Sequence, residues 1–195
     1  MSRGQAKDAD VIFRETQKFR QPWLWAVILS VSLLEIGIFG RCIVRELILG
    51  ELWEKDAAAA RVLLISGSFA IMLCVGIVVL FYIMKLVTEV RSDGLYIRFY
   101  PLHRSFHKIP LENLKECEAR TYRPLREYHG WGVRYVRKGK VYNVSGNLGV
   151  RLDYSNGRHL LIGSQKAEEL AQAIKSVLGK ARMTEFAGLA QGAND

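Results

Sequence analysis

Apolar residues gather in two long runs in the first half of the chain and alternate with polar residues in the second half. The runs are "PWLWAVILSVSLLEIGIFG" at residues 22–40, with one charge, and "VLLISGSFAIMLCVGIVVLFYIM" at residues 62–84, with none. A helix built from the second run is apolar on every side and has no polar stripe. Because about 20 apolar residues span the hydrocarbon core of a bilayer, the pattern predicts a transmembrane hairpin at 22–86, with helices at 22–40 and 62–86.

Two other interpretations of these runs fit less well. Buried helices of a soluble protein would explain the first run alone, but the second is evenly apolar and ends in Phe81, Tyr82 and Lys85, which is typical of a membrane boundary. A cleaved signal peptide disagrees with the mostly polar segment 1–21 before the first run, and no small-residue cleavage site closes that run.

The distribution of lysine and arginine predicts the orientation of the hairpin. The N-terminal juxtamembrane segment 1–21 holds five of these residues, 85–104 holds four, and the loop 41–61 holds four. The excess beside the two chain ends predicts that both termini are cytoplasmic, by the positive-inside rule. We therefore expect a protein of the plasma membrane that crosses it twice.

Residues 87–179 have the period of strands. In "LYIRFY", Leu95, Ile97 and Phe99 share one face, the pattern of a half-buried strand. The turn signals "SDG" at 92–94 and "SNG" at 155–157 predict hairpins. About seven antiparallel strands are expected from this spacing.

One amphipathic helix is predicted after the strands. Ser164 is placed to cap it, apolar residues recur at helical spacing from Leu170 to Leu178, and Gly179 is expected to end it. The predicted fold is an α+β membrane protein: two transmembrane helices, then a small seven-stranded antiparallel barrel or sandwich at 87–179, capped by the C-terminal helix. The Gly- and Ala-rich tail 180–195 is expected to be disordered.

The net charge favours anionic partners, and the cysteines do not indicate a disulfide-bonded fold. The net charge is +9, and residues 87–195 hold eighteen basic and eleven acidic residues, so an anionic leaflet beside them would attract them. Cys42, Cys74 and Cys117 are scattered and form no disulfide framework.

No motif for catalysis or metal binding is found. In a strand, His103 and His107 would lie about 13 Å apart, too far for one metal ion. Ser145, Asp153 and His159 could be arranged as a triad, but no GxSxG turn presents the serine. The sequence predicts no enzyme, no cofactor and no metal site.

The stretch "EYHGWGVRYVRKGKVYNVSG" at 127–146 holds the most promising surface. Its glycines do not form a phosphate-binding motif and fit strands better. Nucleic-acid binding is disfavoured, because Val133 and Tyr135 share the strand face opposite Arg134 and are needed as core. The predicted contact surface is the basic hairpin tip, Arg137, Lys138 and Lys140, with Arg134 on its stem. "NVS" at 143–145 fits a glycosylation acceptor, which a cytoplasmic location would leave unused.

Polar and small residues also occur in the apolar runs. Glu35 is an intramembrane polar residue that we expect to face a partner helix or reach toward the interface. Gly37 and Gly40, with Gly67 and Gly76 opposite, would allow close helix contact within the hairpin or in a homo-oligomer.

Several stretches resemble one family of uncharacterised prokaryotic two-helix membrane proteins with a bacterial pleckstrin-homology-like (PH-like) domain. They are "FRETQKFRQPWLW", "TEVRSDGLYIRFYPL", "KIPLENLKECEARTYRPLREYHGWGVRY", "YNVSGNLGV" and "LLIGSQKAEELAQAI", and the resemblance runs from Phe13 to about Val177. The alanine-rich acidic loop at 51–60 and Ala167, where a proline is usual, depart from that pattern. The resemblance implies a PH-like fold and a membrane location, but no established activity.

These observations lead to two expected functions. The first is a membrane-anchored PH-like interaction module that binds a protein or an anionic lipid headgroup. The alternative is a small accessory subunit of a larger membrane complex, of transporter or secretion type, in which Glu35 and the glycines make the contacts. The expected partners are the lipid bilayer and an unknown protein or anionic headgroup, not nucleic acid.

Overall fold

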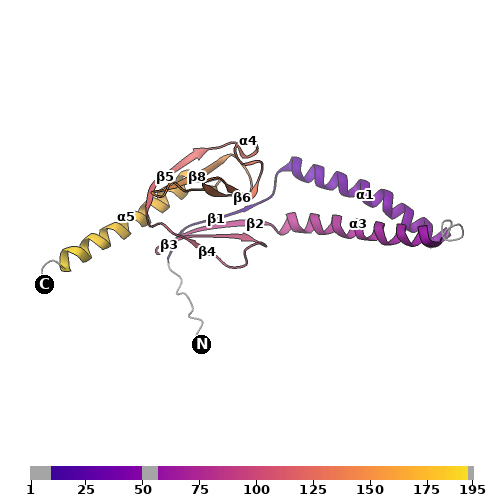
Figure 1. The fold of residues 1–195 in the computed structure, drawn as a ribbon, viewed down its shortest axis with the longest axis horizontal. Coiled ribbons are helices and arrows are strands. Elements are labelled where there is room, and N and C mark those ends of the chain that lie inside the picture. Colours follow the sequence, from indigo (N-terminus) through magenta and orange to yellow (C-terminus); the bar gives the residue numbers. More distant parts are fainter. Residues whose placement is uncertain (1–9, 50–56, 193–195) are drawn as a thin grey trace, which may run out of the picture. The chain divides into compact units, whose positions relative to one another are not determined.

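The computed structural model describes residues 10–49 and 57–192 (Figure 1). The chain separates into two compact units. We call Phe19–Ile83 the helical unit, and Met1–Lys18 with Met84–Asp195 the β-unit. The α+β class is confirmed, with two long apolar helices, strands in two sheets and a C-terminal helix.

The helical unit consists of α1 (Pro22–Leu49) and α3 (Ala57–Ile83). At 1.5 Å per residue these helices are about 42 and 40 Å long, and both are long and apolar enough to cross a membrane. The first helix continues to Leu49, past the end of the apolar run at Gly40, because "RCIVRELIL" is made largely of good helix formers. Of the alanine-rich loop at 51–60, residues 51–56 lie outside the described part of the chain.

Small residues of α3 determine how closely α1 and α3 approach each other. Ala60, Gly67 and Cys74 follow one another at intervals of seven and are the buried residues of α3. A Cβ atom at Gly67 would lie 3.0 Å from Phe39 and 3.3 Å from Ile43, so this glycine lets the helices approach closely. By contrast, Gly37 and Gly76 face open space, and Gly40 meets only Ile36 of its own helix.

The strands of the β-unit form two sheets. The first has the order β1-β2-β3-β4, made of β1 (Val11–Lys18), β2 (Lys85–Arg91), β3 (Gly94–Tyr100) and β4 (His107–Ile109). The second has the order β5-β8-β9-β7-β6, made of β5 (Leu114–Thr121), β6 (Gly132–Val136), β7 (Gly139–Asn143), β8 (Leu148–Tyr154) and β9 (His159–Gly163). A short helix, α4 (Pro124–Tyr128), follows β5 and brings the Tyr128 ring to 5.8 Å from that of Tyr122.

Two details of the predicted sheets are wrong. The described residues contain nine strands, not seven, and β7 and β9 are parallel, so the pairing is not purely antiparallel. The segment before α1 is a strand that the alternation pattern did not reveal, because only Phe13 and Gln17 of its eight residues are buried. The parallel pair arises because β9 inserts between β8 and β7, which brings two hairpins side by side.

The C-terminal helix α5 (Ala167–Gly192) packs against strands of both sheets, with Leu170 and Ile174 completely buried. The sequence predicts its end at Gly179 and disorder afterwards, whereas the helix continues to Gly192. An exposed glycine inside a helix costs only about 1 kcal/mol relative to alanine, and the alanine-rich segment that follows favours helix. Residues 193–195 of the predicted tail lie outside the described residues.

Strand β1 holds the start of α5. The hydroxyl of Ser164 donates to Glu15 Oε2 (2.5 Å), and the backbone N–H of Gln165 donates to Glu15 Oε1 (2.8 Å). The Gln17 amide donates to the carbonyl of Gly163 over 2.7 Å. A segment that precedes the helical unit in the sequence is therefore an integral part of the β-unit.

Candidate anion-binding groove

A groove with a volume of about 550 Å³ lies where the tips of the β6–β7 and β8–β9 hairpins meet the connection from β4 to β5. Its lining includes the predicted basic tip. The lining residues are Ile109, Pro110, Tyr135, Val136, Arg137, Lys138, Gly139, Lys140, Tyr154, Asn156, Arg158, His159 and Leu160.

Gly139 allows the two hairpins to meet. It pairs with His159 across the parallel strands, and the His159 N–H donates to the carbonyl of Lys138 over 2.9 Å. A Cβ atom at Gly139 would lie 2.0 Å from the His159 carbonyl oxygen, closer than any real contact. The glycine is therefore required for the backbones to approach and for both tips to contribute to one groove.

The groove carries charge of one sign. Four of its lining side chains are cationic, and none of the described lining residues is acidic. Such a concentration of like charge repels itself when the groove is empty and attracts anions. The cations are Arg137, Lys138, Lys140 and Arg158.

Lys140 is held between two aromatic rings. Its Nζ lies 5.0 Å from the ring centroid of Tyr135 and 4.7 Å from that of Tyr142. Burial disfavours the ammonium, but the side chains of Tyr142 and Tyr135 outweigh this and raise the pKa of Lys140 above its ordinary value. The lysine is thus fixed and charged at neutral pH. The expectation that Tyr135 belongs to the core is wrong: its side chain is 80% exposed and lies beside Lys140, available to a ligand.

The predicted contact residues are only partly brought together. The structure places Arg137, Lys138 and Lys140 in the groove, while Arg134 pairs with Val141 on the other face of β6 and does not line it. Sequence reasoning missed Arg158 and Tyr154. The signal that could have found Arg158 is its position directly after the "SNG" turn, but its nearness to Lys138 depends on the parallel β7–β9 pairing.

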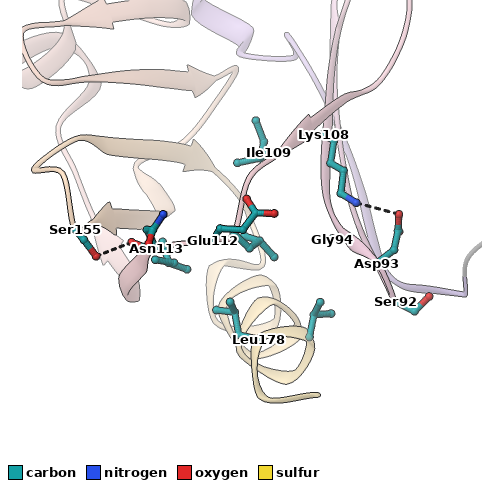
Figure 2. Close-up of a pocket in the computed structure, with 12 residues that line it drawn as sticks. Ser92, Asp93, Gly94, Lys108, Ile109, Glu112, Asn113, Ser155 and Leu178 are labelled. Carbon is teal, nitrogen blue, oxygen red and sulfur yellow. Dashed lines mark hydrogen bonds and ion pairs between the residues drawn. The ribbon is translucent and has the colours of Figure 1, made fainter. Parts of the chain in front are cut away.

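A second cavity, of about 610 Å³, has mixed charge (Figure 2). Figure 2 shows Asp93 and Lys108 on one side, and Asn113 and Ser155 on the other, with Glu112 between them. Lys108 Nζ lies 3.4 Å from Asp93, and the hydroxyl of Tyr96 donates to the same carboxylate over 2.5 Å. The Tyr96 hydrogen bond is the largest cause that lowers the pKa of Asp93. Because its cation is paired, this cavity does not favour anions.

Asn143 of the "NVS" sequence has a structural role. Its side chain is completely buried, and its Oδ1 accepts the backbone N–H of Gly132 over 2.9 Å. The side chain therefore ties β7 to the start of β6, and it offers no accessible amide to a glycosylating enzyme.

The histidine geometry expected from the sequence is wrong. The rings of His103 and His107 lie 4.4 Å apart, because residues 101–106 form a turn and not a strand. No group of three or more metal-ligating side chains occurs among the residues with described positions.

The hypothetical triad is not assembled. Asp153 pairs with His159 across β8 and β9, but its carboxylate accepts three hydrogen bonds from the Arg151 guanidinium. Ser145 lies beyond the other end of these strands, where Gln165 donates to its hydroxyl over 3.4 Å.

In the helical unit, Glu35, the predicted intramembrane polar residue, lies half-buried on α1.

Together these features define an α+β protein that combines two long apolar helices with a two-sheet unit bearing a basic groove. The chain matches the model of a family of unknown function (DUF6141) over residues 4–181, and it belongs to that family. No curated protein and no solved structure matches it.

Proposed function

We propose that this protein is a membrane-anchored interaction module, in which the α1–α3 hairpin spans the plasma membrane and the groove of the β-unit binds an acidic segment of a partner protein. The observation that carries the proposal is the groove itself: four cationic side chains, a charged lysine fixed between two tyrosines, and no acidic residue in the described lining. Both termini are proposed to be cytoplasmic, which the excess of lysine and arginine in 1–21 and 85–104 supports.

Membrane anchorage is supported by the surface of the helical unit. Large apolar side chains are exposed along both helices, where they would be unfavourable in water. Among them are Leu33 (69%), Ile65 (71%) and Met72 (65%). Trp23 and Tyr82 lie near the start of α1 and the end of α3, as in an aromatic belt.

The lining of the groove favours a protein partner over a lipid headgroup. Ile109, Pro110 and the exposed ring of Tyr135 offer apolar contacts beside the cations, and the side chains of a peptide can use these contacts whereas a phosphate group cannot.

Two sheets closed by a C-terminal helix also support a PH-like architecture for the β-unit.

The proposal can be tested with the full chain in detergent and a fluorescein-labelled hexaglutamate peptide, whose binding is followed by fluorescence anisotropy. Lys138→Glu and Arg158→Glu each place a like charge against the peptide and should weaken binding about tenfold or more. Arg134→Glu is the matched control, because Arg134 is an exposed cation of the same hairpin that lies outside the groove.

The Arg134→Glu control also shows which result would contradict the proposal. If Arg134→Glu weakens peptide binding as much as the groove variants do, binding depends on net charge and the groove has no special role. Inositol hexakisphosphate, added as a competitor, tests the headgroup alternative. If it binds through the groove while hexaglutamate does not, the groove recognises phosphate and the acidic-protein proposal fails.

The accessory-subunit function remains a second candidate because of the helical unit. Gly37 and Gly76 meet nothing within 4 Å, which leaves small-residue surface for a further helix, and Glu35 lies half-buried on α1. Crosslinking in native membranes followed by mass spectrometry tests this role. Crosslinks from α1 to another integral membrane protein would support it, and crosslinks confined to the β-unit would contradict it.

A further inference from the structure

One end of the first sheet lies beside both connections to the helical unit. In the register of β1, β2 and β3, Lys18 pairs with Lys85, and Lys85 pairs with Tyr100. We call this the junction end. Pro22, the first residue of α1, follows Lys18 by four positions, and Lys85 follows Ile83, the last residue of α3, by two.

The loop after β3, residues 101–106, therefore begins at the junction end. Paired Cα atoms of adjacent strands lie about 5 Å apart, and two more residues extend the chain by at most about 7 Å. Leu102 is thus within roughly 12 Å of Lys85 along the backbone. This limit follows from register and chain continuity alone.

The loop is held in place by its other side chains. The His103 N–H donates to the carbonyl of Phe99 over 2.7 Å, and the His103 ring contacts the ring of His107. The Phe106 ring lies 4.6 Å from the guanidinium carbon of Arg98. These contacts turn both aromatic residues back onto the β-unit.

The contacts described above do not involve Leu102 or Arg104. Leu102 is 65% exposed, whereas Phe106, the other large apolar side chain of the loop, packs on Arg98, and Arg104 is exposed. Lys18, at the same end of the sheet, is also exposed. An exposed apolar side chain, with one cation in the same loop and another at the same end of the sheet, can bind the interface of an anionic membrane.

We propose that Leu102 inserts into the interface of the cytoplasmic leaflet, with Arg104 and Lys18 contacting anionic headgroups, so that this loop is a second membrane contact of the protein. The inference rests on the proposed anchorage by α1 and α3 and adds a lipid-binding site in the β-unit. The basic groove is a different set of residues, because Leu102, Arg104 and Lys18 do not line it.

The test measures membrane depth by electron paramagnetic resonance on the full chain, reconstituted in vesicles of phosphatidylcholine and phosphatidylglycerol. A nitroxide is attached at Leu102→Cys in a background in which Cys42, Cys74 and Cys117 are alanine. Val11→Cys is the matched control, since Val11 is an exposed apolar residue (48%) that pairs with Arg91 at the other end of the sheet. Val79→Cys, on an exposed position in α3, reports on the anchorage.

The expected result is that collisions with oxygen exceed those with a polar nickel reagent at residues 79 and 102, with a shallower depth at 102, and that the label at residue 11 behaves as in water. A label in lipid at 79 but in water at 102 overturns the loop proposal and leaves the anchorage intact. A label in water at 79 overturns the anchorage and the loop proposal together. Circular dichroism melting of each labelled chain verifies that the fold is retained.

Discussion

Gly139 shows how a single missing side chain creates a site. A Cβ atom at this position would lie 2.0 Å from the His159 carbonyl oxygen, so Gly139→Ala must push β7 and β9 apart. We expect a cost of about 2 kcal/mol or more, seen as a melting temperature lower by roughly 10 °C, together with loss of hexaglutamate binding. Gly179→Ala is the control, because nothing lies near Gly179 and alanine should stabilise α5 by up to about 1 kcal/mol. An unchanged melting temperature for Gly139→Ala would contradict the described β7–β9 approach.

His103 makes stability depend on pH. Burial, followed by the charges of His107 and Lys140, lowers the pKa of His103 below its ordinary value of 6.5. Below pH 6.5 the unfolded chain therefore binds a proton that the folded chain resists, and stability falls as the pH drops from 6.5 toward the lower folded pKa. The melting temperature should decline between about pH 7 and pH 5, and His103→Gln should reduce that decline. An identical decline in the variant would show that His103 is not responsible.

At the scale of elements, the most informative contact joins β1 to α5. The carboxylate of Glu15 accepts hydrogen bonds from the Ser164 hydroxyl and from the backbone of Gln165, so it fixes the turn that leads into α5, about 150 residues away in the sequence. We expect Glu15→Gln to cost about 1–2 kcal/mol, because it weakens two hydrogen bonds that are strengthened by the charge of the carboxylate. Hydrogen exchange should become faster in the first turn of α5.

Glu118→Gln provides the comparison for this variant, because Glu118 is an exposed carboxylate on β5. It should leave exchange in α5 unchanged. Equal effects of the two substitutions would mean that Glu15 acts only through its charge.

At the scale of the whole molecule, the helical unit is an insertion between two paired strands. Lys18 and Lys85 face each other at the ends of β1 and β2, so a two-residue turn can join them. We expect a chain in which Asn-Gly replaces residues 19–84 to be a soluble, folded β-unit, with cooperative thermal unfolding and hexaglutamate affinity close to that of the full chain.

A fragment that starts at residue 87 is the comparison for the Asn-Gly chain. It lacks β1 with the buried Phe13 and Gln17, and it therefore lacks the hydrogen bonds of Gln17 with Gly163 and of Glu15 with Gln165. This fragment should unfold without a cooperative transition. If it unfolds as cooperatively as the Asn-Gly chain, β1 is dispensable and the β-unit is smaller than described.

The sequence by itself determined the elements that depend on local pattern. Two apolar runs predicted α1 and α3, "SDG" and "SNG" predicted hairpins, and the basic turn at Arg137 and Lys138 was identified as a candidate contact because charge at a hairpin tip is exposed without cost to the core. These features follow from residues that are neighbours in the chain, whose periodicity and turn chemistry act before any distant contact forms.

Only the tertiary structure decided which distant residues meet. The membership of β1 in the first sheet, the parallel β7–β9 pair, and the place of Arg158 in the groove beside Lys138 all depend on pairings between segments far apart in sequence. The contact of His103 with His107 is local, but it exists because residues 101–106 form a turn instead of a strand. Such contacts are set by how sheets and hairpins pack, and a one-dimensional pattern of apolar and polar residues carries little information about that packing.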